Sequence, residues 1–479
     1  MSFTPLQRSG LRFLSGSIFN DKRLSRRYSS FLTRMIEHQS NTVGHISLDE
    51  AESRGYYRFL ANERVSHSDM LEQVSKLPSE LISQRSLVVL GDTTEISLKS
   101  QISHLKDADR VGVLSDNKTP GYMAQAHLVL DAQHGGVLGL SDLMLWTRPA
   151  SEGSKLARDR RRKTRSWQEK ESYKWLLGMR QSQSVIASAK EAIFVFDTEA
   201  DLAELWEEVL PGKTDMLVRV QTNNRQMADL PMKLFEYLET VAFCGQYALN
   251  VSTLSRRNYS KNKAQKRQGR QTQLQFRYCP CKLKLRKKKS TITPLYAIEV
   301  KERTEFVPEG ESPIKWYLLT TRSIESAEQA RDLIRYYEWR WQIEQLFRIL
   351  KRKGFALEQT ELTSFDAILR QTILSFGAAI RVMQLLRARD QVDGQGTDEL
   401  FSKNEQRCLA VLNQKYQGNT HKQQNPFPKD KLAWASWIIA RIGGWKGYQS
   451  QHPPGPITFL RGWEKFNTYF DAWMLFVNK

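Results

Sequence analysis

The apolar and polar positions divide the chain into a helical first part, a strand-rich middle and a helical tail. Up to about Ser75 the apolar residues recur at helical spacing, and Asn20 and Asp21 are candidates for the cap of the first clear helix. Short apolar runs follow, and residues 212–321 are predicted to be rich in strands. From about Ser364 the spacing is helical again, so we expect three successive regions.

Two of the short apolar runs end in an aspartate. SLVVLGD ends in Asp92, and AIFVFD ends in Asp197 with a helix expected after it. The carboxyl ends of strands are where open α/β sheets place their sites. An aspartate there is also a common turn former or helix cap, so each one alone is a weak signal.

The stretch YYEWRWQIEQLFRILKRKG, residues 336–354, predicts a helix that presents one acid among cations. On a helical wheel that starts at Tyr337, the charged residues within roughly 80° of one another are Arg340, Glu344, Arg348 and Lys351. The adjoining arc is apolar and would hold the helix against a core; it comprises Tyr336, Trp339, Ile343, Leu346, Phe347 and Leu350. Taken alone, the helix is best explained as a solvated face, with ion pairs from Arg340 to Glu344 and from Glu344 to Arg348.

The composition adds a strong positive charge. The 479 residues include 72 Lys and Arg against 52 Asp and Glu, which gives a formal charge of +20 and a pI near 9.7. Such an excess attracts polyanions, and nucleic acid is the commonest large one. A basic membrane-surface protein is the competing interpretation. The sequence has no lipidation signal and no long amphipathic basic helix at a terminus, and no apolar run approaches the ~18 residues of a membrane span.

The cysteines and the N-terminal residues indicate the cellular compartment in which the protein is expected. The four cysteines are too few and too scattered for a disulfide framework, and CPC lacks the second pair that a zinc site needs. We therefore expect reduced thiols in a cytosolic protein. Residues 2–20 are basic without an acid, so a transit peptide is conceivable, although a first amphipathic helix is favoured.

Two basic segments are candidates for contact with nucleic acid. Arg256 to Lys289 holds fourteen Lys or Arg and no acid, and LQFRYCPCKLKLRKKK within it alternates apolar and basic residues at strand period. Cations along one face of a strand could follow a phosphate backbone, which we favour over a solvated loop. Arg23, Arg26 and Arg27 lie in the first turns of a predicted helix, where the dipole disfavours cations. An external anion would explain them, and a tolerated surface is an equally common explanation.

Asp92, Asp197 and Glu344 form a possible set of three carboxylates. Carboxylates about 4 Å apart repel by about 4 kcal/mol per pair at an effective dielectric near 20, so such a set needs cations beside it. All-oxygen ligands suit Mg²⁺ or Mn²⁺. Two such ions about 3.5–4 Å apart can activate a water or a 3′-hydroxyl and stabilise the leaving oxygen at a phosphodiester. Arg340 and Lys351 would then hold nearby phosphates and keep Glu344 ionised.

The same residues carry a resemblance to a known family. The pattern Y-x2-R-x3-E-x6-K is present as Tyr337, Arg340, Glu344 and Lys351. DTT at Asp92 and DTEAD from Asp197 occur upstream in the matching order. DKRLSRR with YYRFLAN, and ARIGGWKGY with PPGPITFLRGW, are similar to the family's terminal regions. Over nearly its whole length the chain resembles the insertion-sequence-four family of bacterial DDE transposases.

The resemblance implies an α/β fold with an RNase H-like catalytic core. It implies a helical DNA-end-binding domain over 1–75, the core over 76–363 with a β-rich insertion at about 212–321, and a helical dimerisation domain over 364–479. It also implies cut-and-paste transposition by strand nicking, hairpin formation and resolution, and strand transfer. Two Mg²⁺ or Mn²⁺ ions per active site would be held by Asp92, Asp197 and Glu344. The expected partners are double-stranded DNA, as transposon-end inverted repeats and target, and a second copy in a homodimer, in the bacterial cytoplasm at the nucleoid.

The resemblance also implies contacts to DNA. Tyr337, Arg340 and Lys351 would contact end phosphates near the cleaved bond, and Trp316 would stack on a flipped base. A strand-core aromatic is the alternative for Trp316. The N-terminal arginines that would contact the transposon end are Arg23, Arg27 and Arg58. One departure is Gln125, where relatives often have a histidine, so no role of that histidine is carried over.

Two other functions share part of these features. An inactive DNA-binding regulator of transposition would dimerise with the active enzyme, but the presence of all three acids and all four motif residues argues against it. A structure-specific RNase H-like nuclease would share the acids without requiring Trp316 or a dimerising tail. We therefore expect an active DDE transposase.

Overall fold

The computed structural model describes residues 19–479 except for 152, 154–159, 161–163, 210–213, 222, 224, 252–253, 259–262, 285–291, 352–354, 390–393, 449–452 and 478–479. The chain forms two compact units, one made of Met1–Glu191 with Arg340–Lys479 and the other of Ala192–Trp339. We call them the first and the second unit. The first amphipathic helix expected within residues 2–20 lies almost entirely outside the described residues.

The first unit begins with helices, as the sequence predicts. They are α1 (Lys22–His38), α2 (Val43–Ile46), α3 (Glu50–Leu60) and α4 (His67–Leu81). Asp21 caps α1 by accepting from the backbone N–H of Arg23 at 2.8 Å, and Asp49 caps α3 by accepting from that of Glu52 at 2.7 Å. The expected cap at Asp21 is therefore confirmed.

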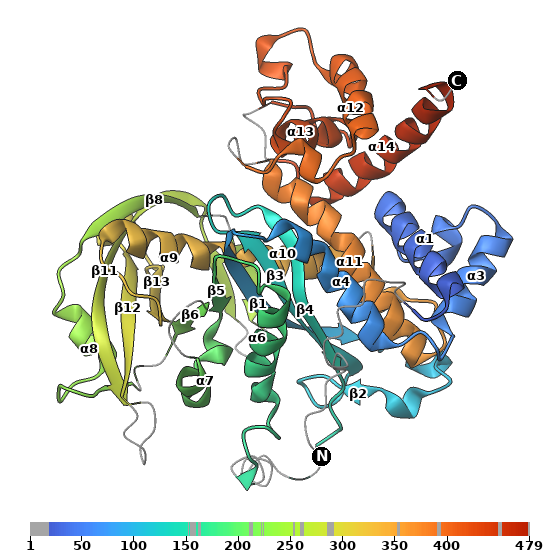
Figure 1. Cartoon of the computed structure of the whole chain (residues 1–479). Helices are drawn as coiled ribbons and strands as arrows, with labels where there is room; N and C mark the ends of the chain where they lie inside the picture. The colour runs from blue at the N-terminus through green and yellow to red at the C-terminus, as the bar shows by residue number, and fades with distance from the viewer. Residues whose placement is uncertain are drawn as a thin grey trace. The chain divides into compact units, whose positions relative to one another are not determined.

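An antiparallel sheet follows the helices in this unit. Its strands are β1 (Ser86–Ser97), β2 (Gly112–Val113), β3 (Pro120–Asp131) and β4 (Val137–Trp146). β3 pairs with β1, β2 and β4, and Figure 1 shows β1 and β3 side by side. The stretch AQAHLVLDAQHGGVLGLSDLMLW, residues 124–146, predicts two strands joined by a Gly-containing turn, and β3 and β4 confirm it. The sequence predicts a helix from Trp167 to Gln183; helix α6 (Lys174–Val185) begins later and packs on β4.

The structure corrects the position of Asp92. The residue was expected at the end of a short strand, but β1 continues to Ser97 and Asp92 lies within it, opposite Ala126 of β3. The polar run TTEIS keeps the strand period: Thr94 and Ile96 are buried, while Thr93 and Glu95 are partly exposed. Pairing with β3 thus extends the strand beyond the apolar run that marked it in the sequence.

The second unit contains a mixed sheet. Its elements are β5 (Glu191–Phe196), α7 (Ala203–Glu208), β6 (Thr214–Val220), β7 (Gln226–Met227), α8 (Leu234–Glu239), β8 (Gly245–Val251), β9 (Leu254–Asn258), β10 (Lys263–Arg267), β11 (Arg270–Lys284), β12 (Ile292–Glu302), β13 (Lys315–Thr320) and α9 (Ala327–Trp339). β5 and β6 pair in parallel, and the sheet continues antiparallel through β13, β12 and β11. The strand-rich region expected at about 212–321 is confirmed.

The long helix predicted over 336–354 is interrupted at Arg340. Helix α9 ends at Trp339, and α10 (Trp341–Lys351) begins directly after Arg340, which lies in a turn. The backbone N–H of Ile343 bonds to the carbonyl of Arg340 at 3.2 Å, so the new helix starts with a tight turn. Neither Pro nor Gly marks the break in the sequence, so the apolar pattern runs through it.

The rest of the first unit is helical, as expected from about Ser364. Its helices are α11 (Phe365–Ala388), α12 (Lys403–Tyr416), α13 (Leu432–Ile442) and α14 (Pro456–Val477). α11 is buried along most of its length and contacts α1, α4, α10, α13, α14 and β4. No helix in the described part of the chain is long and apolar enough to cross a membrane.

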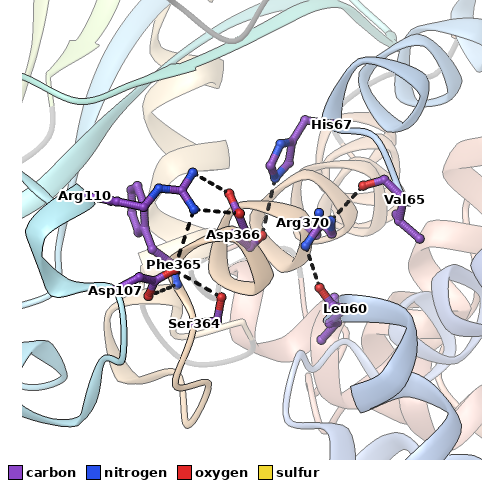
Figure 2. A network of polar contacts seen from close by, with 9 residues as sticks. All are labelled: Leu60, Val65, His67, Asp107, Arg110, Ser364, Phe365, Asp366 and Arg370. Carbon is purple, nitrogen blue, oxygen red and sulfur yellow. Dashed lines mark hydrogen bonds and ion pairs between the residues drawn. The ribbon is translucent and has the colours of Figure 1, made fainter. Parts of the chain in front are cut away.

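A polar network joins the start of α11 to the N-terminal helices (Figure 2). The guanidinium of Arg370 donates to the backbone carbonyls of Leu60 and Val65, both at 2.8 Å. Arg110 binds both carboxylate oxygens of Asp366 at 2.7 and 2.9 Å. The connection between α3 and α4 is thereby fixed on α11.

Two glycines let α13 and α14 cross in backbone contact. A Cβ on Gly462 would lie 1.9 Å from the carbonyl oxygen of Ile439, and one on Gly443 would lie 2.0 Å from that of Thr458. These glycines belong to ARIGGW and FLRGW, the stretches singled out in the sequence. Both crossing helices therefore require glycine for their spacing.

We expect Gly462→Ala to destabilise the first unit by about 1–3 kcal/mol, because the added methyl group forces the two helices apart. Thermal unfolding followed by circular dichroism measures the change. Gly455→Ala is the matched control, since a Cβ there meets nothing within 4 Å. Equal melting temperatures for the two variants would contradict the close crossing.

Candidate active site

One arginine joins two of the three predicted carboxylates within the first unit. Arg340 donates from Nη1 to Oδ2 of Asp92 at 2.8 Å and from Nη2 to Oε1 of Glu344 at 2.7 Å. The three side chains are 17%, 18% and 28% exposed, in the order Arg340, Asp92 and Glu344. The structure thus brings together residues 248 positions apart in the sequence. The ion pair expected between Arg340 and Glu344 is confirmed.

Local structure holds each partner in place. Asp92 follows the buried run Leu87–Gly91 of β1, and its Oδ1 accepts from the backbone N–H of Thr93 at 2.7 Å. Glu344 lies in the first turn of α10, where the helix dipole favours a carboxylate. The opposite side of α10 is buried, and this helix contacts both β1 and α11. The two carboxylates therefore meet because a strand and a helix pack together.

Arg348 does not contribute the second ion pair that the helical wheel suggested. Its guanidinium lies over the ring of Trp341, with Cζ 5.8 Å from the ring centroid, and Nη1 is 3.5 Å from Oε1 of Gln345. The cation–π contact draws the side chain toward the exposed Trp341 and away from Glu344. Glu344 is instead held by Arg340.

Lys351 lies in the last turn of α10. Burial lowers the pKa of its ammonium group, while the charges of Glu358 and Glu95 act to raise it. Glu358 is itself fixed, since its Oε1 accepts from the backbone N–H of Ser97 at 3.2 Å. A cation on α10 is thus placed next to β1, the strand that carries Asp92.

Asp197 belongs to the second unit. It directly follows β5, as predicted, and its Oδ1 accepts from the backbone N–H of Glu199 at 2.9 Å, which caps a short 3₁₀ helix. The last residue of DTEAD, Asp201, accepts from Arg225 at 2.5 Å and from the indole N–H of Trp206 at 3.1 Å. Asp201 therefore has a structural role that the motif alone does not reveal.

Trp316 and Tyr337 pack against each other in the second unit. Their ring centroids are 5.8 Å apart at an interplanar angle of 61°, an edge-to-face contact. Trp316 is partly exposed on β13, whereas Tyr337 on α9 is only 7% exposed. The two aromatic residues predicted to contact DNA are therefore neighbours, and their roles toward DNA stay predictions.

The predicted DNA-end contacts lie on α1 and α3. Arg23 and Arg58 are exposed. Arg27 is partly buried, with Cζ 5.6 Å from the ring centroid of Tyr56. Arg23 and Arg58 are free to reach a ligand on the surface, while Arg27 also packs between the two helices.

The basic strand β11 differs from its prediction in part. Its burial alternates as expected, and Lys282 and Lys284 are exposed. Arg277, however, is buried; it donates to Glu299 at 2.5 Å and to the carbonyl of Val241 at 2.8 Å. The expectation that all cations of this strand face a phosphate backbone is therefore wrong for Arg277, because a neighbouring strand supplies an acid. Residues 285–291 lie outside the described part of the chain.

Comparison with known families identifies both functional parts. Residues 13–65 match the transposase DNA-binding family, and residues 145–381 match the transposase DDE domain family. The chain is a DDE transposase. The DNA-binding match covers α1 to α3, and the DDE match contains Asp197 and the whole of α9 and α10; Asp92 lies outside both matches.

The carboxylates of the transposase fit a divalent metal by their chemistry. Asp92 and Glu344 both direct carboxylate oxygens to the guanidinium of Arg340. Mg²⁺ and Mn²⁺ also prefer carboxylate oxygens as ligands. Among the described residues, no group of three or more His, Cys, Asp or Glu is arranged to hold a metal ion. Two of the three predicted carboxylates, Asp92 and Glu344, thus converge on one cation in the first unit.

We expect Arg340→Gln to destabilise the transposase by about 1 kcal/mol, because Asp92 and Glu344 lose their shared cation and the partial exposure of all three groups limits the effect. The melting temperature at low and high salt measures the change, and the loss should shrink as salt screens the two acids. Arg348→Gln, on the helix that follows Arg340, is the control. If both variants melt alike at low salt, the bridge adds nothing to stability.

Proposed function

We propose that this transposase moves its own insertion sequence by a cut-and-paste reaction. The steps are nicking at the transposon end, formation and resolution of a hairpin on that end, and strand transfer into target DNA. The observation that carries the proposal is the convergence of Asp92 and Glu344 on Arg340 in a chain that has both a DNA-binding and a DDE domain. The motif Y-x2-R-x3-E-x6-K further supports membership of the insertion-sequence-four family.

Asp92, Asp197 and Glu344 would hold the metal ions. DDE transposases use divalent metal ions, and the all-oxygen donor set favours Mg²⁺ or Mn²⁺. Two such ions, when bound, would activate a water or a 3′-hydroxyl and stabilise the leaving oxygen. The chain's own part is to hold the carboxylates close together, and Arg340 does this for Asp92 and Glu344 by donating to both.

The cations near Glu344 would position the DNA. Lys351 lies on α10 with Glu344, and Arg340 lies in the turn just before that helix; both would contact phosphates near the cleaved bond. Trp316 would stack on a flipped base, with Tyr337 supporting its ring through the edge contact. Arg23, Arg27 and Arg58 would contact the inverted repeat through the N-terminal helices.

The transposase would act as a homodimer that brings two ends together. The end of α14 supports this, because Leu475 and Phe476 are 71% and 77% exposed and follow a stacked row of Phe466, Phe470 and Trp473. Phe466 itself is buried, whereas Leu475 and Phe476 form an exposed apolar end of the helix, and exposed apolar patches are typical of interaction surfaces. We propose three domains, over 1–75, 76–363 and 364–479, and action at the nucleoid in the bacterial cytoplasm.

We expect Glu344→Gln to abolish cleavage while end binding is retained, because the change removes a charged ligand and keeps the shape of the side chain. Purified protein is incubated with Mg²⁺ or Mn²⁺ and DNA carrying the element's ends, and products are separated on denaturing gels. Glu328→Gln, an exposed glutamate on α9, is the control and should cleave normally. Binding without cleavage by the unchanged protein would favour a regulator of transposition.

Arg58→Ala should weaken binding to the transposon end and lower the slope of log K against log salt by about 0.9, the contribution of one phosphate contact. Arg54→Ala is a matched control on the same helix, because Arg54 is ion-paired with Glu50. Binding is measured by fluorescence anisotropy over a series of salt concentrations. An unchanged slope for Arg58→Ala would remove this residue from the interface.

A further inference from the structure

The C-terminal helices enclose a cavity that the proposed reaction does not use. Its volume is about 400 Å³, within the range of small-ligand sites. The wall is formed by the end of α11, the segment from His421 to Phe427, α13 and the chain on both sides of residues 449–452. All of these belong to the first unit.

Flat apolar groups make up much of this wall. Trp437 and Trp445 meet edge to face with ring centroids 6.5 Å apart, and Phe427 lines the same cavity. The prolines Pro426, Pro453 and Pro454 also line it. Within the described part of the chain, the indole N–H of Trp445 has no hydrogen-bond acceptor. These rings give a planar ligand flat surfaces on which to stack.

The charged side chains that line the described part of the cavity are all basic. Arg389, His421 and Lys422 line it, and the described lining residues include no aspartate or glutamate. His421 and Lys422 are exposed, while Arg389 donates to the carbonyl of Pro454, which also lines the cavity. Arg441 lies over the ring of Trp437, with Cζ 5.5 Å from the centroid, and adds positive charge behind the aromatic wall. The cavity is therefore suited to a ligand that is both planar and anionic.

We propose that this cavity binds one unpaired nucleotide of a DNA strand. The base would lie against Trp445 and Phe427, and the adjoining phosphates would face Lys422 and Arg389. Aromatic rings beside cations are the means by which proteins hold unpaired nucleotides. A paired base is not available for such insertion, so the cavity selects single strands or strand ends. The proposal depends on the protein being a DNA-binding transposase and not on the roles of Asp92 or Glu344.

The experiment uses the full chain and a short oligothymidylate that carries one 5-iododeoxyuridine. After irradiation, mass spectrometry of the digested protein locates the cross-link. We expect it at Trp445 or Phe427. Cross-links confined to the N-terminal helices or to the region of Trp341 would overturn the proposal, as would the absence of any cross-link.

A pair of charge variants provides the second readout. Lys422→Glu should weaken binding of the oligothymidylate about tenfold, because a phosphate contact becomes a repulsion. Lys403→Glu makes the same charge change on an exposed lysine at the start of α12, which does not line the cavity, and should change the affinity less than about twofold. Binding of the transposon-end duplex should be the same for both variants. Equal losses for the two variants on the oligothymidylate would show a general charge effect and overturn the proposal.

Trp445→Phe keeps an aromatic ring in the cavity wall but gives it a smaller stacking surface. The aromatic wall remains, so the cross-link should persist with a lower affinity for the oligothymidylate. Cleavage of end DNA by this variant distinguishes the two proposals. Retained cross-linking supports the cavity proposal even if cleavage is lost. Lost cross-linking with retained cleavage would overturn the cavity proposal and leave the proposed reaction standing.

Discussion

The placement of the N-terminal helices depends on one buried guanidinium. Arg370 of α11 donates to the carbonyls of Leu60 and Val65, and Leu60 is the last residue of α3. A helix end exposes carbonyls with no partner in the helix and carries the negative end of its dipole. Burial lowers the pKa of Arg370, and the carbonyls with nearby Asp366 offset the penalty of burying its charge. The buried guanidinium of Arg370 thus holds the end of α3 and the segment before α4 on α11.

The same helix also positions the candidate site. Phe347 of α10 meets Phe376 of α11 edge to face, with centroids 6.4 Å apart. The segment between α10 and α11 is tied to the segment after β1, because Gln101 donates to the carbonyl of Glu358 and Lys106 to that of Thr363. These bonds limit how far α10 can slide along β1. The meeting of Asp92 with Glu344 is therefore a consequence of packing throughout the unit.

Local pattern predicted the types of element and several positions correctly. The cap at Asp21, the place of Asp197 after β5 and the pair of Arg340 with Glu344 all follow from near neighbours in sequence. The length of β1 and the burial of Arg277 depend on partner strands, which a local pattern does not encode. No Pro or Gly marks the helix break at Arg340. Arg340 contacts Asp92, which is 248 positions away, and a local pattern does not encode such a contact.

Charge balance at Arg340 decides what the site can accept. Two carboxylates and one guanidinium leave one negative charge in excess, and a DNA phosphate adds another of the same sign. At an effective dielectric near 20, like charges about 4 Å apart repel by about 4 kcal/mol. In the proposed site, a DNA phosphate beside Asp92 and Glu344 would add to this repulsion, and further positive charge would offset it. Lys351 supplies one such charge, but burial lowers its pKa and Glu358 and Glu95 lie close to it. The divalent ions of the proposed reaction would add positive charge beside the same carboxylates.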